Sequence, residues 1–96
     1  MAINISLVNF TEQGIKGIKD SPKRAQGFRD LAKKHGVNVR DIYWTAGQYD
    51  MVVITEGSDD ALATVLLSAA RLGNVRTHTL RAMDLETFQR VLAKVD

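Results

Sequence analysis

Residues 3–10 read INISLVNF and place apolar side chains on both sides of an extended chain. Successive side chains of a strand point to opposite faces: Ile3, Ile5 and Leu7 to one, Val8 and Phe10 to the other. Residues 51–56, MVVITE, have the same two-sided apolar character. Such a strand is typical of the middle of a sheet that is covered on both faces. The sequence therefore predicts two central strands.

Apolar side chains at three-and-four spacing predict three helices elsewhere in the chain. Their ends are marked by residues that cap helices or stop them. These are Ser21-Pro22 and Gly36 for a helix over 22–35, Ser58 and Gly73 for the second, and Asp84 for the last. Residues 11–20 contain two glycines and are predicted to be a connector with about one helical turn.

Two further strands, 37–45 and 75–82, carry charged side chains and are predicted at the sheet edges. In the first, Val37, Val39 and Tyr43 are expected on the face opposite Ile42 and Trp44. Strand, helix, strand, strand, helix, strand and a C-terminal helix form the ferredoxin-like arrangement of an α+β protein. Right-handed crossovers place both main helices on one face of a sheet ordered 4-1-3-2. We expect one domain over residues 1–96.

The second face of this sheet requires a cover, because the central strands are apolar on both faces and the helices shield only one. The simplest way to cover this face is to pack it against the same face of a second copy of the chain. We therefore expect a homodimer with its sheets packed face to face.

Composition narrows the function classes. The chain has 13 Lys and Arg, 11 Asp and Glu, a net charge of +2 and no cysteine. The lack of cysteine excludes disulfides, thiolate nucleophiles and thiolate metal sites. The longest apolar run, residues 51–54, is far shorter than the ~18 residues of a membrane span. No targeting segment is evident, so we expect a cytoplasmic protein without a membrane partner.

Basic side chains concentrate in residues 16–34, which hold seven Lys and Arg. A solvated helix face explains them, and weak anion binding or docking of another protein are the alternatives. No aromatic recognition elements are interleaved with these charges, and residues 51–55 offer none on which RNA bases could stack. Nucleic acid is therefore not an expected partner.

Three short stretches carry a family resemblance: DIYWT at 41–45, GQYD at 47–50 and GNVRT at 73–77. Together with FTEQGI at 10–15 and SPKR at 21–24, they resemble the GYD-domain family. The resemblance covers the chain from the first strand to about Leu85. It implies a dimeric α+β barrel and a family without a settled activity.

The second half is also similar to the effector-binding domains of leucine-responsive, Lrp/AsnC-type, regulators. The likeness rests on Gly47-x-Tyr49-Asp50 and on Gly73-x-Val75-x-Thr77-x-Thr79. Those regulators bind amino acids at subunit interfaces and also carry a helix-turn-helix. Since 96 residues leave no room for that module, the resemblance implies a stand-alone sensor domain.

Five residues are candidates to line a ligand site: Tyr43, Trp44, Tyr49, Asp50 and His78. Each also has a structural explanation. The aromatic rings can fill an interface, Asp50 can accept backbone N–H groups from the turn, and a lone histidine is usually structural. Gly47 is expected to provide the positive φ of the turn between the two middle strands.

The favoured hypothesis is a non-enzymatic, homo-oligomeric module that binds or senses a small metabolite, in a cavity between sheet and helices or at the dimer interface. The alternative is a cofactor-independent enzyme of the monooxygenase or isomerase type, with His78 or Asp50 as its base. A third possibility is a protein that acts through docking at residues 16–34. No cofactor is expected, and two distant histidines lack the spacing of metal ligands.

Overall fold

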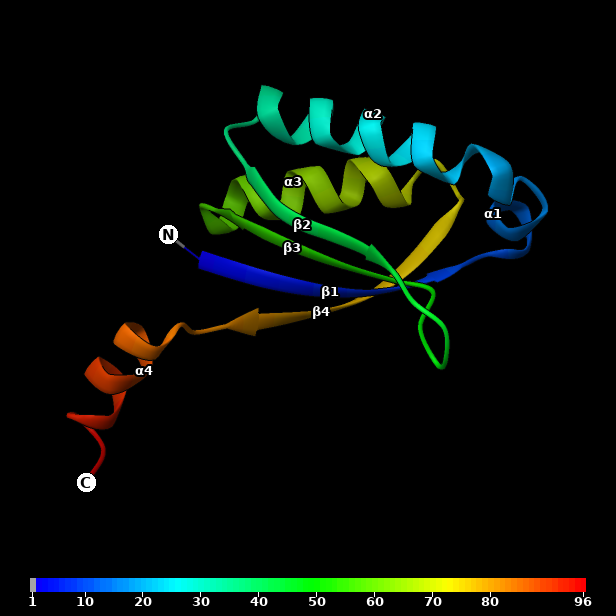
Figure 1. Cartoon of the computed structure of the whole chain (residues 1–96). Coiled ribbons are helices and arrows are strands. Elements are labelled where there is room, and N and C mark those ends of the chain that lie inside the picture. The colour runs from blue at the N-terminus through cyan, green and yellow to red at the C-terminus, as the bar shows by residue number, and fades with distance from the viewer. Residues whose placement is uncertain (1) are drawn as a thin grey trace.

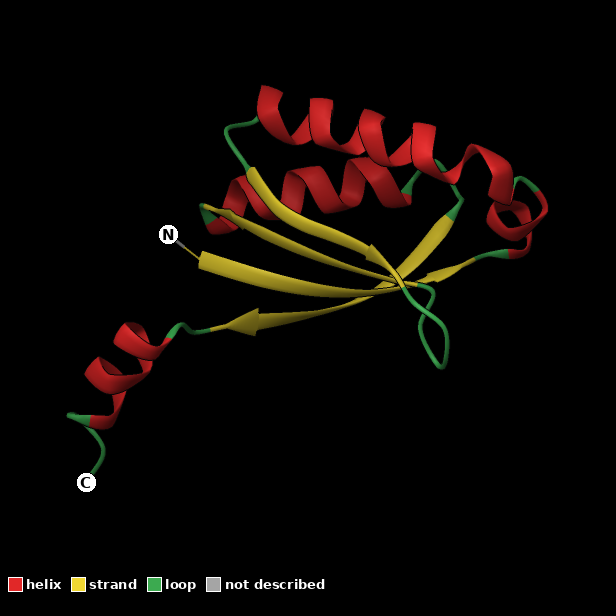
Figure 2. Ribbon diagram, viewed as in Figure 1, coloured by secondary structure: helices red, strands yellow, loops and turns green. Residues whose placement is uncertain are grey.

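A computed structural model describes residues 2–96, in which four strands form one sheet and helices cover one of its faces (Figures 1 and 2). The elements are β1 (Ala2–Phe10), α1 (Glu12–Lys16), the 3-10 helix η1 (Ile18–Asp20), α2 (Ser21–Lys34), β2 (Asn38–Trp44), β3 (Met51–Gly57), α3 (Asp59–Ala70), β4 (Val75–Ala82) and α4 (Leu85–Leu92). The α+β, ferredoxin-like order predicted from the sequence is confirmed.

The sheet is antiparallel and ordered β2-β3-β1-β4, which is the predicted 4-1-3-2 order. β1 pairs with β3 from Ala2 to Val8 on one side and with β4 from Ile3 to Phe10 on the other. The two strands that are apolar on both faces, β1 and β3, are therefore the central pair, as predicted.

Burial alternates strictly along β3, and this alternation identifies the two faces of the sheet. Met51, Val53 and Thr55 are buried under the helices, whereas Val52 and Ile54 point to the opposite face and are only half-buried. Figure 1 shows α2 and α3 on one side of the sheet and no helix across the other. We call this second side the open face.

The start of α2 differs from the sequence prediction. Ser21 has helical dihedral angles and lies inside α2, while Asp20 occupies the N-cap and makes no side-chain capping bond. The predicted serine cap is therefore wrong, because η1 leads directly into the helix. The Ser21 hydroxyl instead accepts a hydrogen bond from Trp44 Nε1 at 2.9 Å. Gly36 ends the helix with φ of 72°, as expected.

The faces of β2 also differ in part from the prediction. A register shift between Val39 and Asp41 marks a β-bulge. Since a bulge inserts one extra residue, it reverses the alternation, and Val39 and Ile42 both pack under the helices. The expectation that Val39 shares a face with Tyr43 is therefore wrong. The opposition of Tyr43 to Trp44 holds, because they pair with Val52 and Met51 respectively.

Close packing of the two main helices is confined to one end. Ala32 of α2 meets Leu62 and Val65 of α3 and Val37 in a fully buried cluster. A second cluster, Val8, Met51 and Val53, belongs to the sheet and is covered in part by Phe28. The helices therefore leave the sheet less completely covered toward the start of α2.

A corner formed by α1 closes that end of the molecule. Thr11 caps α1 by accepting from the Gly14 N–H at 3.1 Å and donates its hydroxyl proton to the Gly73 carbonyl at 2.6 Å. Gly14 is buried, and a Cβ there would collide with the backbone carbonyl oxygen of Asn74. Glycine at 14 thus lets α1 lie directly against the turn before β4.

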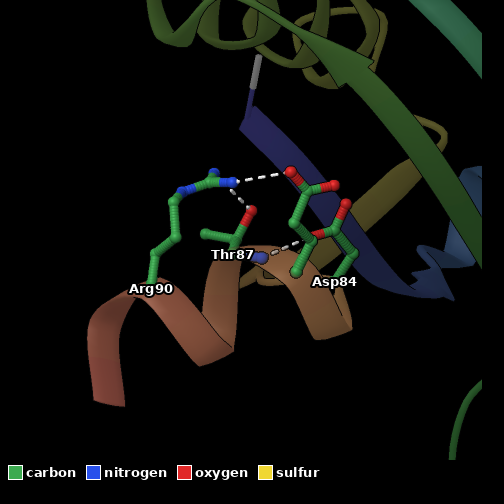
Figure 3. A network of polar contacts seen from close by, with 4 residues as sticks. Asp84, Thr87 and Arg90 are labelled. Carbon is green, nitrogen blue, oxygen red and sulfur yellow. Dashed lines mark hydrogen bonds and ion pairs between the residues drawn. The ribbon is translucent and has the colours of Figure 1, made fainter. Parts of the chain in front are cut away.

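α4 projects from the end of β4, away from the rest of the chain (Figure 1). Asp84 caps it, accepting from the Thr87 N–H at 2.8 Å, and that hydrogen bond lowers the pKa of the Asp84 carboxyl because it favours the charged form (Figure 3). Arg90 bonds to Glu86 and to the Thr87 hydroxyl. The apolar side chains of α4 are all exposed: Leu85, Phe88, Val91 and Leu92.

None of the helices in residues 2–96 has the length and apolar character needed to cross a membrane.

Replacing Gly14 or Gly27 by alanine should change the free energy of unfolding in opposite directions. Gly14→Ala should lower the free energy of unfolding by about 2 kcal/mol, since its methyl group meets backbone. Gly27→Ala should raise it by about 0.5–1 kcal/mol, because no atom lies within 4 Å of a Cβ at this helical position. Denaturant unfolding at equal protein concentration measures both. A loss of stability in Gly27→Ala would contradict the open space at that site.

Candidate functional site

A cavity of about 540 Å³ lies between the helices and the sheet. Its walls come from α2, α3 and all four strands, and most of the side chains that line it are apolar. They include Val8, Phe10, Phe28, Leu31, Ile42, Met51, Val53, Leu66, Leu72 and Val75. The volume lies within the range of ligand sites, about 300–1,000 Å³.

Small residues on the two helices create this space. Ala25 and Gly27 of α2 and Ala69 of α3 all line the cavity. A Cβ added at Gly27 would meet nothing within 4 Å, although this position lines the cavity. Gly27 and Leu72 are exposed as well as lining, so the cavity reaches the surface between α2 and α3.

Polar groups of the cavity are few: Ser6, Ser21, Arg24, Asn74 and Thr77. The Ser6 hydroxyl is buried and shares a hydrogen bond of 3.0 Å with the Thr79 hydroxyl. The Ser21 hydroxyl accepts a hydrogen bond from the indole N–H of Trp44. The hydroxyl of Thr55, buried and without a hydrogen-bond partner in residues 2–96, lies outside the cavity lining.

Arg24 contributes the one charged side chain of the lining. Its guanidinium donates from Nη1 to the Gly17 carbonyl at 2.9 Å and from Nη2 to the Gly14 carbonyl at 3.1 Å. A Cβ at Gly17 would lie 3.3 Å from Nη1, so glycine there gives the guanidinium its room. The corner of α1 therefore holds Arg24 at the end of the cavity.

A second, more polar hollow adjoins the cavity at Arg24 and Asn74, which line both. Its other lining residues are Gln13, Gly17, Asp20 and Lys23. Gln13 Nε2 donates to Asn74 Oδ1 at 2.9 Å and to the Leu72 carbonyl at 3.1 Å. Arg24 and Asn74 thus separate an apolar chamber from a polar, water-accessible one.

The five candidates from the sequence do not line this cavity. Trp44 comes nearest, through its hydrogen bond to Ser21. Tyr43 lies on the open face, 56% exposed, with its hydroxyl 3.4 Å from Asp41 Oδ1. The structure separates these adjacent aromatic residues onto opposite faces of β2.

Tyr49 and His78 are brought together. Their rings pack edge to face with centroids 5.9 Å apart, and Tyr49 Oη lies 3.4 Å from His78 Nδ1. His78 pairs with Leu7, so it belongs to the open face. This pair joins the loop after β2 to the edge strand β4.

Asp50 makes backbone contacts. Its Oδ2 accepts the Phe10 N–H at 2.8 Å, and its own N–H donates to the Val8 carbonyl at 2.8 Å. The acceptor role proposed for Asp50 is present, although the N–H group comes from β1 instead of the turn. Gly47 has φ of 134°, the positive value expected for the turn. The loop before β3 is thereby tied to the end of β1.

Sequence reasoning assigned Arg24 to a solvated basic face and did not single out Gly27. The missed signals are local. Arg24, Phe28 and Leu31 recur at i, i+4 and i+7, which places the arginine on the apolar stripe. A glycine in a helix interior lowers helix stability, so Gly27 indicates a position where the absence of a side chain matters. No group of three or more potential metal-ligating residues occurs within residues 2–96.

The GYD domain family model matches residues 5–92. The chain belongs to the GYD domain family. This confirms the family resemblance of the GQYD and GNVRT stretches. No curated protein sequence matches this GYD domain protein.

Solved structures share its fold. The GYD domain is similar to the feast or famine regulatory protein from M. tuberculosis complexed with L-methionine, with 18% identity and a TM-score of 0.63 over 88% of this chain and 51% of that one. A Thermus thermophilus protein is 22% identical with a TM-score of 0.55, covering 88% of this chain and 95% of that one.

A third similar structure is provisionally named a glycine cleavage system transcriptional repressor. It is 16% identical with a TM-score of 0.53, over 86% of this chain and 46% of that one. The GYD domain chain thus spans about half the length of the repressor and about half the length of the feast or famine regulator. At these identities the likeness establishes the fold, including the expected similarity to regulator domains.

Proposed function

We propose that this GYD domain protein is a non-enzymatic module that binds a small molecule in the cavity beneath α2 and α3, and that it works as a homodimer. The observation that carries the binding proposal is the cavity itself. Its volume is about 540 Å³, it opens to the surface beside α2, and most of the side chains that line it are apolar, as is usual for small-molecule sites.

The space is built into the sequence, which supports the proposal. Gly27 places no side chain in the middle of α2, at a cost of about 0.5–1 kcal/mol in helix stability relative to alanine. A domain of this size is only marginally stable. Glycine at position 27 therefore favours open space over helix stability.

The structural neighbours support the same class of function. One of them is a regulatory protein that holds L-methionine, and another carries the name of a transcriptional repressor. A fold can host several functions, so the cavity is the main support for a binding role and the neighbours add to it.

The homodimer rests on the open face. Apolar side chains from three strands lie there together, half-buried or exposed: Ile3, Ile5, Leu7, Val52, Ile54 and Leu80. α4 presents a further apolar stripe with nothing packed on it within residues 2–96, and Leu85 is 72% exposed. Contiguous apolar surface of this kind marks an interface. A second copy is the proposed occupant, because a two-fold axis brings the same apolar face of both subunits together.

Ile54→Lys should therefore convert the dimer to monomers, since a lysine at the centre of the open face buries an unpaired charge in the interface. Native mass spectrometry at micromolar concentration measures the change. The matched control is Leu67→Lys, on the outer side of α3, where Leu67 is 71% exposed. A wild-type monomer, or a folded Ile54→Lys dimer, would contradict the proposal.

Filling the cavity mouth should block binding. N-phenyl-1-naphthylamine, a neutral apolar fluorophore, should bind the wild-type protein saturably with one site per chain. Gly27→Phe should weaken that affinity about tenfold, because the ring occupies ligand volume and one lost methylene alone removes about 0.8 kcal/mol. Ala63→Phe, at an exposed position of α3, is the control. Unchanged binding by folded Gly27→Phe would place the fluorophore elsewhere.

The alternative function, a cofactor-independent enzyme, is favoured by one observation, the Tyr49–His78 contact. It gives His78 the neighbour that can orient a general base. If His78 is that base, His78→Ala should lower turnover at least about 10²-fold, while a binding module keeps its ligand affinity. Oxygen uptake and ligand binding, measured on the same preparation, separate the two outcomes.

A further inference from the structure

The charge of the cavity indicates the kind of ligand it takes. We infer, building on the proposed binding function, that the ligand is an apolar molecule bearing a single carboxylate and no amino group, with its carboxylate on Arg24. Thirteen of the lining residues are apolar or glycine, and no aspartate or glutamate is among them. An apolar body and one anionic head match this distribution.

Arg24 lies at the cavity with no carboxylate of residues 2–96 paired to its guanidinium. The hydrogen bonds that fix its guanidinium go to the carbonyls of Gly14 and Gly17, which carry no net charge. None of the ion pairs within residues 2–96 includes Arg24. Guanidinium has five N–H donors in a planar fork, so donors remain after two bonds. A carboxylate is the acceptor that this fork fits best.

Asn74 offers a second donor beside it. Its side-chain oxygen accepts from Gln13 Nε2, which fixes the amide with its NH₂ group at the other end. That NH₂ group makes no hydrogen bond within residues 2–96. Arg24 and Asn74 line the cavity together at its polar end. The first turn of α2, to which Arg24 belongs, adds the positive end of the helix dipole.

The same inventory disfavours two other ligand classes. An amino acid brings an ammonium group, and the cavity lining offers it no carboxylate. Asp20, the one carboxylate in the lining of the second hollow, lies there with Lys23 and Arg24 and forms an ion pair with neither within residues 2–96. A multiply charged anion such as a phosphate ester would find one cation in the cavity lining against its two negative charges. A monocarboxylate leaves neither a buried charge nor the guanidinium unpaired.

Three ligands with the same eight-carbon body test the inference on the wild-type dimer by isothermal titration calorimetry at pH 7 and low salt. They are octanoate, octan-1-ol and 2-aminooctanoate. Octanoate should bind at least about tenfold more tightly than either of the others, as expected for one charge-assisted hydrogen-bonded pair. Equal affinities for octanoate and octan-1-ol, or tighter binding of 2-aminooctanoate, would overturn the inference.

Arg24→Gln should remove the preference, binding octanoate and octan-1-ol within about twofold of each other, whereas Arg24→Lys should retain part of it. Arg29→Gln, an exposed arginine on the same helix, is the matched control and should keep the full preference. The wild-type comparison stands even if Arg24→Gln is too unstable to assay.

The result also distinguishes the two levels of proposal. If Gly27→Phe blocks both eight-carbon ligands equally and neither is preferred, the cavity is a binding site of another ligand class. If none of the three ligands binds the wild-type protein but N-phenyl-1-naphthylamine does, the ligand class is wrong and the binding site stands. If none of the four compounds binds, both the ligand class and its site are wrong.

Discussion

The double pairing of β1 is the constraint on which the rest of the structure depends. Its backbone groups bond to β3 along one edge and to β4 along the other, so the first strand of the chain joins the two halves of the sheet. Because β1 is a central strand, alternate side chains of β1 pack under the helices, and the others form part of the open face. Val8 and Leu7, adjacent in sequence, thereby belong to two different surfaces of the molecule.

The cavity follows from unequal helix packing above this sheet. At one end, Ala32 and Leu62 allow the helices and the strands to close into a dry core. At the other end, the corner of α1 holds the start of α2 through Arg24, and the small residues of the facing helix stretches do not fill the gap. The same hydrogen bonds that fasten the corner fix the direction of the only charged side chain in the lining. One group of residues therefore sets both the shape of this end of the cavity and the position of its charge.

The fold was accessible from the sequence because its signals are local and repeated. Two-sided apolar strands, caps at Ser58 and Asp84, and glycine at 36 each predict a feature that the structure contains. The β-bulge near Val39 and the helical state of Ser21 were not accessible, since both depend on neighbours distant in sequence. A cavity between sheet and helices was one of the two expected locations, but its lining residues were not accessible for a similar reason, because the lining depends on how the elements diverge. The site prediction chose aromatic and titratable residues, and three of them, Tyr43, Tyr49 and His78, lie on the open face, where the sequence analysis expects the dimer interface.

The central position of β1 also shapes how the chain acquires its structure. Ser6 and Thr79, whose hydroxyls are hydrogen-bonded, are separated by 73 residues along the chain. During synthesis β1 emerges first, yet neither of its edges can be filled until β3 and then β4 have left the ribosome. Pairing strands at such a separation requires a loss of chain entropy on loop closure before any favourable contact forms, and this slows folding. The strand that organises the native sheet is thus the one that waits longest for its partners, and a chain interrupted before β4 leaves one of its edges unpaired.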